Sequence, residues 1–320
     1  MLRYIGRRLL LMIPTLLGIT LIVQLFIMIT PGDPARLLAG NEVSEDEVEA
    51  LRVEMGLRDP FPIRYGKYIS NVLSGNFGTS YRTKRPVVTE IAQRFPYSLM
   101  LVIISMIMTL GIGIPIGIYA ATHQYSWKDN LAILASLFCV SMPSFWFALI
   151  LIQFLCVRLG LLPTSGVSTW QGWILPSVTL ALAHAASIAR QMRSNLLEVV
   201  RQDYITTARS KGQSERKVLY RHALKNAIIP IIQIVGGMFG AAMGGSMISE
   251  VIFSLPGLGS YTIAALNARD YPVIQTSVLI MSTWFAIILL LIDIAFSVVD
   301  PRIRAQYARK RAKVRKEVAA

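Results

Sequence analysis

The sequence predicts an all-α, polytopic membrane protein with six transmembrane helices. Of its 320 residues, 54% are apolar and 16% are charged, and the mean hydropathy is +0.53. Soluble domains carry about a quarter charged residues. A helix needs about 20 apolar residues to cross roughly 30 Å of hydrocarbon, and six charge-poor blocks reach that length. These blocks predict spans at Leu9–Ile29, Tyr97–Ala121, Asn130–Val157, Trp173–Leu196, Ala227–Ser249 and Tyr271–Val298.

The first span has the outward features of a secretory signal, because Arg3, Arg7 and Arg8 precede its apolar run. The run is longer than the roughly 7–15 residues of a signal-peptide core, and no small-residue cleavage site closes it. We therefore expect it to remain in the protein as an uncleaved transmembrane helix.

Basic residues gather on one side of the predicted membrane. The N-terminus, the segment from Arg190 to Lys225 and the tail from Asp300 carry essentially the whole net charge of +14, whereas the opposite loops, one of them with Glu250, are nearly neutral. Cytoplasmic loops of membrane proteins carry an excess of Lys and Arg. We therefore expect both termini in the cytoplasm, with the tail against anionic lipid head groups. Because topology explains the basic charge, no nucleic-acid partner is expected.

Residues 31–96 are predicted to form a small extracytoplasmic cap with helices of its own. Ser44-Glu45-Asp46-Glu47 is typical of a capping box with an acidic first turn, and Gly56 is a suitable stop for that helix. An amphipathic run from Tyr65 to Leu73 follows, and Gly75-Asn76-Phe77-Gly78 predicts a turn. Two interpretations of the cap stay open, a packing lid and a dock for an external protein.

The fifth span carries glycines at i, i+4 spacing, with further small residues beside them: Gly236, Gly240 and Gly244. Small residues at this spacing let two helices approach closely. We expect these glycines to pack against a helix of this chain or of a partner, in preference to lining a pore.

No catalytic or metal-binding pattern is found in the sequence. It lacks the phosphate loop GxxxxGK[ST] and the patterns HExxH, paired CxxC and GxSxG. Cys139 and Cys156 lie about 25 Å apart on one predicted helix, at about 1.5 Å per residue, so they cannot pair or share a metal. We expect no catalytic residue, no metal and no cofactor in this chain. The energy for any active process must come from an ion gradient or from another subunit.

The most informative segment runs from Asp203 to Pro230, DYITTARSKGQSERKVLYRHALKNAIIP, a basic stretch between apolar ones. It predicts two short helices joined at Lys211-Gly212 on the cytoplasmic side. Gly212 is expected to end the first helix, since glycine tolerates the positive φ common at that position. Such a hinge on the basic side of a membrane protein is expected to transmit force or information to a soluble partner.

This segment resembles the cytoplasmic EAA-type loop of permease subunits in bacterial ABC importers, and most closely that of the peptide/nickel branch. The family loop reads approximately DY-x-x-TARAKG and then HAL-x-NA-x-x-P. The matching residues are Asp203, Tyr204, Thr207, Ala208, Arg209, Lys211 and Gly212, followed by His222, Ala223, Leu224, Asn226, Ala227 and Pro230. Ser210 departs from the pattern, because Ala is common there.

Further landmarks extend the resemblance over nearly the whole chain and in the same order as in the family. They are Pro31-Gly32-Asp33-Pro34-Ala35, Gly75-Asn76-Phe77-Gly78-Thr79-Ser80, Leu162-Pro163-Thr164, Phe253-Ser254-Leu255-Pro256-Gly257-Leu258-Gly259, Arg269-Asp270-Tyr271-Pro272 and Asp300-Pro301-Arg302. A chance match to one motif is easy to obtain, whereas a chance match to the collinear set is not.

The resemblance implies a heterodimer of two permeases in the bacterial inner membrane, gated by two cytoplasmic ATPases and supplied by an extracytoplasmic solute-binding protein. ATP would bind to the partners and not to this chain. The loop's short helix would sit in a groove of the ATPase, with Ala208 small enough for close docking. The residues expected to couple the two proteins are Asp203, Tyr204, Thr207, Ala208, Arg209, Lys211, Gly212, Arg221, His222 and Asn226.

The resemblance also suggests a domain organisation and a cargo. Residues 1–30 form the N-terminus and first helix, 31–96 the cap, 97–299 the permease core with coupling loop 198–226, and 300–320 the basic tail. Short peptides are the preferred cargo. Nickel or metal chelates, glutathione or another small solute are alternatives within the same branch.

Two other classes of function compete with this interpretation. An ion-coupled secondary transporter needs a relay of intramembrane ionisable groups and often an inverted repeat. Only isolated groups are found, His184 in the fourth span and Asp293 near the end of the sixth, and no repeat is evident. His184 stays a weak candidate for the translocation path, and Asp293 is expected to pair with a basic residue near the interface. A membrane-embedded assembly protein would leave the coupling loop unexplained.

Overall fold

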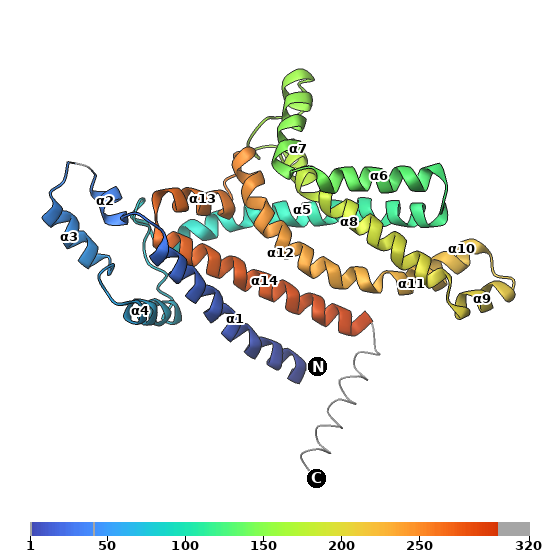
Figure 1. The fold of residues 1–320 in the computed structure, drawn as a ribbon, viewed down its shortest axis with the longest axis horizontal. Coiled ribbons are helices and arrows are strands. Elements are labelled where there is room, and N and C mark those ends of the chain that lie inside the picture. The colour runs from blue at the N-terminus through green and yellow to red at the C-terminus, as the bar shows by residue number, and fades with distance from the viewer. Residues whose placement is uncertain (1, 41, 300–320) are drawn as a thin grey trace, which may run out of the picture. The chain divides into compact units, whose positions relative to one another are not determined.

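The computed structural model describes residues 2–40 and 42–299, and this part of the chain is helical (Figure 1). Within it, β-structure is limited to an isolated bridge between Thr79 and Pro86. The predicted all-α class is therefore confirmed. The predicted basic tail from Asp300 lies outside the described residues. The elements are α1 (Leu2–Ile29), α2 (Pro34–Ala39), α3 (Glu45–Glu54), α4 (Phe61–Leu73), α5 (Val87–Thr122), α6 (Trp127–Ser141), α7 (Ser144–Leu151), the π-helical η1 (Ile152–Arg158), the 3₁₀ turn η2 (Trp170–Trp173), α8 (Ile174–Val200), α9 (Asp203–Ser210), α10 (Glu215–Lys217), the π-helical η3 (Val218–Ala223), α11 (Leu224–Ala227), α12 (Ile229–Ile252), α13 (Leu258–Ala268) and α14 (Tyr271–Val299).

Each predicted span corresponds to a helix or a helix pair that is apolar enough to cross a membrane. Five single candidates qualify by length and composition: Arg8–Ile29, Val87–Thr122, Trp170–Val200, Ile229–Ile252 and Tyr271–Ile294. The sixth is the pair Trp127–Ser141 and Ser144–Arg158, which passes the same test together but is bent by 101°. Six spans are reached when this pair counts as one.

The bend corrects the prediction of one continuous third helix at 130–157. The residue before a proline is pushed out of the α-helical region, and proline has no N–H to continue the helix. Met142 has φ −79° and ψ 129°, and Pro143 stands immediately before α7. The prediction of a continuous helix rested on the apolar composition of the block and did not account for the helix-breaking effect of Pro143.

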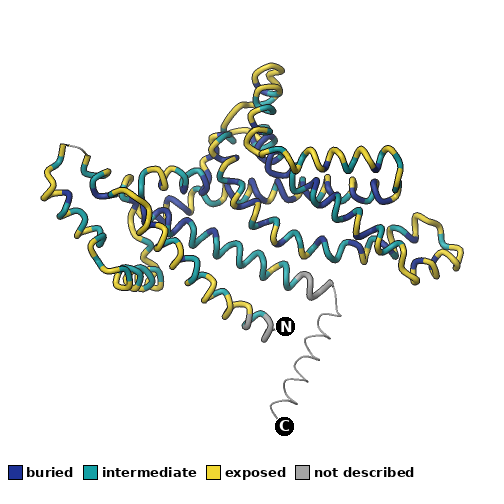
Figure 2. Tube along the Cα trace, viewed as in Figure 1, coloured by how far each residue is buried: buried dark blue, intermediate teal, exposed yellow. Residues whose placement is uncertain are grey.

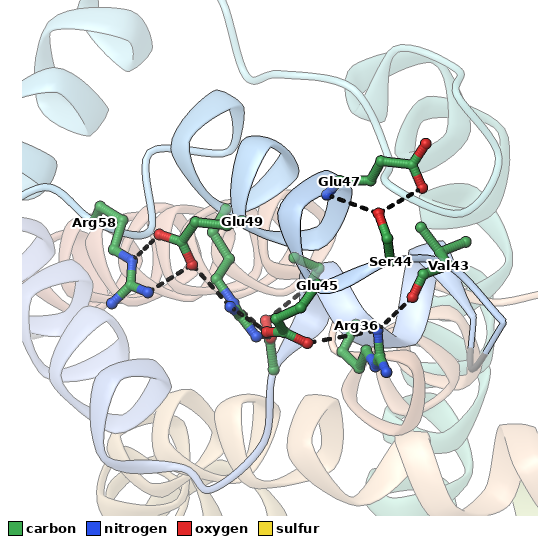
Figure 3. Close-up of polar contacts among 10 residues, drawn as sticks. Arg36, Val43, Ser44, Glu45, Glu47, Glu49 and Arg58 are labelled. Carbon is green, nitrogen blue, oxygen red and sulfur yellow. Dashed lines mark hydrogen bonds and ion pairs between the residues drawn. The ribbon is translucent and has the colours of Figure 1, made fainter.

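The cap begins its second helix as the capping pattern predicts. The Ser44 hydroxyl accepts a hydrogen bond from the Glu47 N–H at 3.4 Å and donates to the Glu47 carboxylate at 3.2 Å (Figure 3). After α3, Gly56 has φ +67°. Gly75 and Gly78 also have positive φ, as the predicted turn requires. Helix α5 begins at Val87, within the residues predicted to form the cap.

An arginine–carboxylate network stabilises α3. Arg52 donates to Asp33 at 2.7 Å and to Glu45 and Glu49 at 2.8 Å. Arg58 donates to both oxygens of Glu49, at 2.5 and 2.6 Å (Figure 3). Hydrogen bonds from Arg58 and then Arg52 lower the pKa of Glu49 to about 2. Glu49 therefore stays ionised at neutral pH and bridges two guanidinium groups.

The described chain forms two compact units. Unit 1 holds the residues up to Leu101 together with Thr164–Thr169 and Met243–Ala286, and unit 2 holds Val102–Pro163, Trp170–Ala242 and the residues from Ile287 onward. The span that contains α8 is the most buried candidate, with 61% of its most apolar window inside, against 17% for α1 (Figure 2). The packing of unit 2 is therefore organised around α8.

Helices α5 and α8 approach closely at two glycines of α5. A Cβ on Gly113 would lie 2.7 Å from the Ala185 carbonyl oxygen, and one on Gly117 would lie 2.5 Å from that of Ala189. Real Cβ atoms do not come so close, so only glycine permits this crossing. The glycines of the fifth span were predicted to pack against a helix, and this pair was not, although it has the same i, i+4 spacing.

Candidate coupling site

The coupling segment folds as two helical pieces joined by a glycine turn. The first piece, α9, begins at Asp203, whose carboxylate suits the positive end of a helix. It ends at Ser210, and Gly212 then adopts φ +72°. The second piece runs through α10, η3 and α11 toward α12. The geometry at Gly212 is the one that the sequence predicts for a C-terminal stop.

The inner face of the segment belongs to the core of unit 2. Ile205 of α9 and Ala223 of η3 are fully buried, and Val218 is nearly so. They share one apolar cluster with Met192 and Leu196 of α8. The same cluster includes Ala121 of α5 and Ile231 of α12, so the segment packs as one body with three candidate spans.

Polar contacts join the two pieces to each other. Arg209 donates to both carboxylate oxygens of Glu215, at 2.8 and 3.2 Å. A ring nitrogen of His222 lies 2.7 Å from the side-chain oxygen of Gln213. The Asn226 amide donates to the Tyr204 hydroxyl at 2.8 Å, across the two helical pieces.

A further hydrogen bond ties this segment to the membrane-spanning part of unit 2. The buried Asn195 side chain of α8 donates to the Ala227 carbonyl at 3.2 Å, and Gln191 donates to Asn195 at 2.8 Å. Helix α8 and the end of α11 are thus held together next to the coupling segment.

The electrostatics of the Arg209–Glu215 pair favour the charged state. Hydrogen bonds from Arg209 are the largest cause that lowers the pKa of Glu215, with a smaller Coulombic effect of the same guanidinium. Both side chains are substantially exposed, so the pair contributes little to stability. The pair joins the last turn of α9 to the first residue of α10.

The outer face of the segment holds most of the residues singled out in the sequence. Asp203, Tyr204, Thr207, Arg209, Lys211, Gly212, Arg221 and Asn226 are exposed, and His222 is half-buried. Ala208 differs from them, because it is 6% exposed and belongs to the internal cluster. Any influence of Ala208 on a partner is therefore indirect, through the position of α9.

The weaker candidates have ordinary surroundings. A ring nitrogen of His184 lies 2.9 Å from the Leu180 carbonyl of its own helix, and the side chain is half-buried. A Cβ on Gly236 would lie 3.0 Å from Leu289 of α14, whereas no atom comes within 4 Å of one on Gly244. Gly240 is half-exposed. Gly236 therefore lies against a helix of this chain, whereas Gly244 does not.

Glu250 is a buried carboxylate whose position was not predicted from the sequence. The predicted topology placed it in an external loop, whereas in the structure it lies in the last turn of α12, which ends at Ile252, and is fully buried. Its carboxylate accepts hydrogen bonds from Ser98 at 2.6 Å, Ser246 at 3.2 Å and the Ser260 N–H at 2.8 Å. A Cβ on Gly257 would lie 2.2 Å from the same carboxylate. The glycine-rich loop before α13 is therefore folded around Glu250.

Asp270 has a comparable role at the start of α14. It accepts hydrogen bonds from the Ser80 hydroxyl at 2.5 Å and from the N–H groups of Tyr81 at 3.1 Å and Arg82 at 3.3 Å. Two motifs far apart in the sequence, the glycine turn before Ser80 and the loop before α14, are joined through this carboxylate. Periodicity gives no sign of such a contact.

Comparison with protein families gives this arrangement its context. The family described as "Binding-protein-dependent transport system inner membrane component" matches residues 113–305, which is more than half of the chain. A companion model, "Binding-prot-dependent transport system membrane comp, N-term", matches residues 1–102. The chain belongs to this family of binding-protein-dependent permeases. The motifs of the coupling segment fall within the first match.

Curated relatives resemble this permease over almost its full length. The glutathione transport system permease protein GsiC of Salmonella paratyphi A is 43% identical over 304 residues, which is 95% of this chain and 99% of the relative. The protein of the same name from Escherichia coli K12 is 42% identical with the same coverage.

Solved structures share the fold. Two crystal forms of the inward-facing MetNI methionine ABC transporter match with TM-scores of 0.57 and 0.58, at 18% and 17% identity. Each match covers 67% of this chain and 98% of the other. At such low identity the likeness concerns the fold alone.

The family resemblance stated from the sequence is thus confirmed. The chain is a permease subunit of an ABC importer of the peptide/nickel-type branch, a transport subunit and not itself an enzyme. It is a multi-pass protein of the inner membrane. Permeases of this kind act together with a second permease, an ATPase and a binding protein.

Proposed function

We propose that this permease pairs with a different permease to form a pore that moves short peptides from an external binding protein into the cytoplasm. Two ATPase subunits gate the pore through residues 203–230. Both termini of the chain are cytoplasmic in this proposal. The distribution of the net charge of +14 supports that orientation, since it places the coupling segment on the same side as both termini.

The observation that carries the coupling proposal is the apolar cluster shared by the segment and α8. Ile205 and Val218 pack in the same core as Met192 and Leu196, and all four are at most 1% exposed. Close-packed interiors transmit displacement, because side chains have no free volume in which to absorb it. A displacement of α9 is therefore transmitted to α8.

The exposed surface of α9 offers the contact for the ATPase. Tyr204 is 44% exposed, Asp203 and Thr207 are also exposed, and Lys211 follows at the turn. Arg209 points to Glu215 and stiffens this surface. Ala208 lies on the buried side of α9, where its small side chain lets α9 pack close to the core.

A substitution at the turn tests the coupling. Gly212→Glu adds charge and strain at φ +72°, at a position where no atom lies within 4 Å of an added Cβ. We expect copurification of the ATPase and ATP-driven uptake into proteoliposomes, with ion gradients collapsed, to fall about tenfold or more at equal membrane abundance. Gly75→Glu is a matched control, since Gly75 has φ +77° and equally open space in the cap.

The control should retain the ATPase. Unchanged uptake and unchanged copurification in Gly212→Glu would contradict the proposal. Ala208→Glu is a poorer test, because a charge placed in the buried cluster is expected to impair folding first.

The cargo proposal rests on the named relatives. Proteins 42–43% identical to this chain are permeases of glutathione transport systems, and glutathione is itself a short peptide. Glutathione is accordingly the second candidate within the peptide class. No specific observation favours nickel or metal chelates or another small solute.

The cargo is tested with the complete importer in proteoliposomes. Uptake of a labelled dipeptide, of labelled glutathione and of a labelled nickel chelate is measured in separate assays. Uptake of glutathione without uptake of the dipeptide would narrow the cargo to that tripeptide. Uptake of the nickel chelate without uptake of either peptide would overturn the peptide proposal and leave the coupling proposal intact.

A further inference from the structure

A groove on unit 2 lies between α5, α6 and α8 and has a volume of about 370 Å³. Its wall is almost entirely apolar. The side chains along the wall include Ile112, Ile116, Leu131, Ala135, Leu182 and Ala186. Helices α5 and α6 are both candidate membrane segments, so the groove opens within the bilayer region.

The groove has one polar end. Tyr119 near the end of α5 and Trp127 and Lys128 at the start of α6 line it there, and Cys139 lies toward the other end. From Trp127 to Cys139 the groove follows α6 for about 18 Å, at about 1.5 Å per residue. This is close to half of the roughly 30 Å hydrocarbon core, the depth of one leaflet.

The Lys128 ammonium group at the polar end of the groove has no carboxylate partner among the described residues. The neighbouring Asp129 is occupied, because Arg193 donates to both of its oxygens at 2.6 Å. Lys128 itself lies 5.6 Å from the centre of the Tyr119 ring, a distance compatible with a cation–π contact. Its positive charge is thus available at the mouth of the groove.

The aromatic residues place this end at the membrane interface. Trp127 is 71% and Tyr119 is 46% exposed. Trp and Tyr are enriched at the depth of lipid head groups, where an amphipathic ring has both polar and apolar neighbours. A lysine beside them is at the right depth for a phosphate.

The wall itself offers little to a polar solute. The Ser136 hydroxyl, which lines the groove, already donates to the Ala132 carbonyl at 2.7 Å. The remaining lining residues beyond the polar end are aliphatic, apart from the Cys139 thiol. An apolar chain with an anionic head fits both the wall and the mouth.

We propose that this groove binds one acyl chain of an anionic phospholipid, with its phosphate at Lys128. Because bulk lipid tails are as apolar as the groove, the hydrophobic effect does not distinguish a bound chain from a free one. Packing and the Lys128 charge therefore set the affinity. One lysine near an anionic surface corresponds to a preference of about fivefold for an anionic over a zwitterionic head group.

The test uses the full chain in nanodiscs with equal amounts of phosphatidylglycerol and phosphatidylcholine of the same acyl chains. Lipids retained on the protein are counted by native mass spectrometry after release. We expect about fivefold more retained phosphatidylglycerol. Lys128→Gln should lower this preference, and Ala135→Phe should reduce retention of both lipids by filling the groove.

Matched controls separate the groove from general effects. Lys67→Gln removes a lysine of the cap, which pairs with Asp59, and should leave the preference unchanged. Leu134→Phe changes an exposed α6 residue that does not line the groove and should leave retention unchanged. Equal retention of the two lipids, or a preference that Lys128→Gln leaves unchanged, would overturn the proposal.

A second copy of the chain is the competing occupant. Oxidation of a Cys156→Ser variant tests it through Cys139, the half-buried thiol in the groove. A disulfide-linked dimer formed through Cys139, without retained lipid, would show that protein covers the groove and would refute lipid binding. A monomer that retains phosphatidylglycerol supports it.

Discussion

Glu250 and Asp270 each hold a loop of unit 1 in place by accepting several hydrogen bonds. A buried acceptor of this kind is favourable only while its donors are aligned with it. Around Glu250 the donors come from α5, α12 and the start of α13, so one side chain joins three elements. The glycines beside it make room for the carboxylate.

Removal of the Glu250 carboxylate should destabilise the protein. Glu250→Ala leaves the Ser98 hydroxyl and the Ser260 N–H without their acceptor, each at a cost of about 1–3 kcal/mol, whereas the Ser246 hydroxyl can still donate to the Met243 carbonyl at 2.8 Å. We expect a loss of roughly 2 kcal/mol or more, seen as a lower thermal unfolding midpoint in detergent. Glu198→Ala, at an exposed site of α8, is the control. An equal midpoint in the two variants would show that the hydrogen-bonded carboxylate does not stabilise the fold.

At the scale of elements, close approach of helices and local charge pairing decide the geometry. The crossing of α5 and α8 depends on Gly113 and Gly117, where a single added carbon would collide with a backbone oxygen. The break between α6 and α7 depends on one proline. The cap helix α3 depends on a capping serine and an arginine network.

The glycine crossing can be tested within one helix. Gly117→Ala should destabilise unit 2, because the new Cβ would lie 2.5 Å from a carbonyl oxygen and the helices must separate. Gly111→Ala should be neutral or mildly stabilising, by up to about 1 kcal/mol, because nothing lies within 4 Å and alanine favours helix. Thermal unfolding of both variants provides the comparison. Equal effects at the two positions would show that the crossing tolerates a side chain.

The cap should lose stability in acid. The pKa of Glu49 is lowered from 4.5 to about 2, chiefly by hydrogen bonds from Arg58, so ionised Glu49 stabilises the folded cap at and above pH 4.5. This contribution disappears as the pH falls from about 4.5 toward 2, because protonation breaks the pairs. Hydrogen-exchange protection of α3 amides, corrected for intrinsic rates, should fall over that range. Arg58→Gln should weaken protection at pH 6 and shift the loss to higher pH; an unchanged profile would contradict the assignment.

For the whole molecule, the consequence of the fold is that the coupling segment and the membrane helices of unit 2 share one core. The cluster joins α9, η3 and α11 to α5, α8 and α12. A bound ATPase would contact the exposed outer face of the coupling segment. The spans pack against the buried inner face of the same segment. Binding and gating are therefore expected to be separable by mutation.

Loosening this core should uncouple the transporter. Met192 is fully buried in the cluster, and Met→Ala in a core costs about 2–5 kcal/mol and leaves a cavity. We expect Met192→Ala to retain the ATPase on copurification while uptake falls several-fold. Met192→Leu conserves volume and should keep near-normal uptake. Loss of ATPase binding together with uptake would indicate that the contact surface itself, and not the transmission, depends on Met192.

Much of this architecture is predictable from local patterns. Apolar blocks located the candidate spans, because crossing the hydrocarbon requires an uninterrupted apolar length. The capping pattern at Ser44 and the turn at Gly212 follow from the preferences of single residues for particular backbone angles. The family motifs identified the permease, because they were collinear over the chain.

The amino-acid sequence by itself thus determined the membrane class, the helical segments and the family of this protein, since composition and short-range spacing encode all three. The tertiary structure alone decided that Ala208 faces inward, that Glu250 is buried and that Gly117 contacts α8. It also decided that Lys128 stands at the mouth of an apolar groove. Each depends on which distant residues come into contact, and periodicity along one helix carries no information about the partner that covers it.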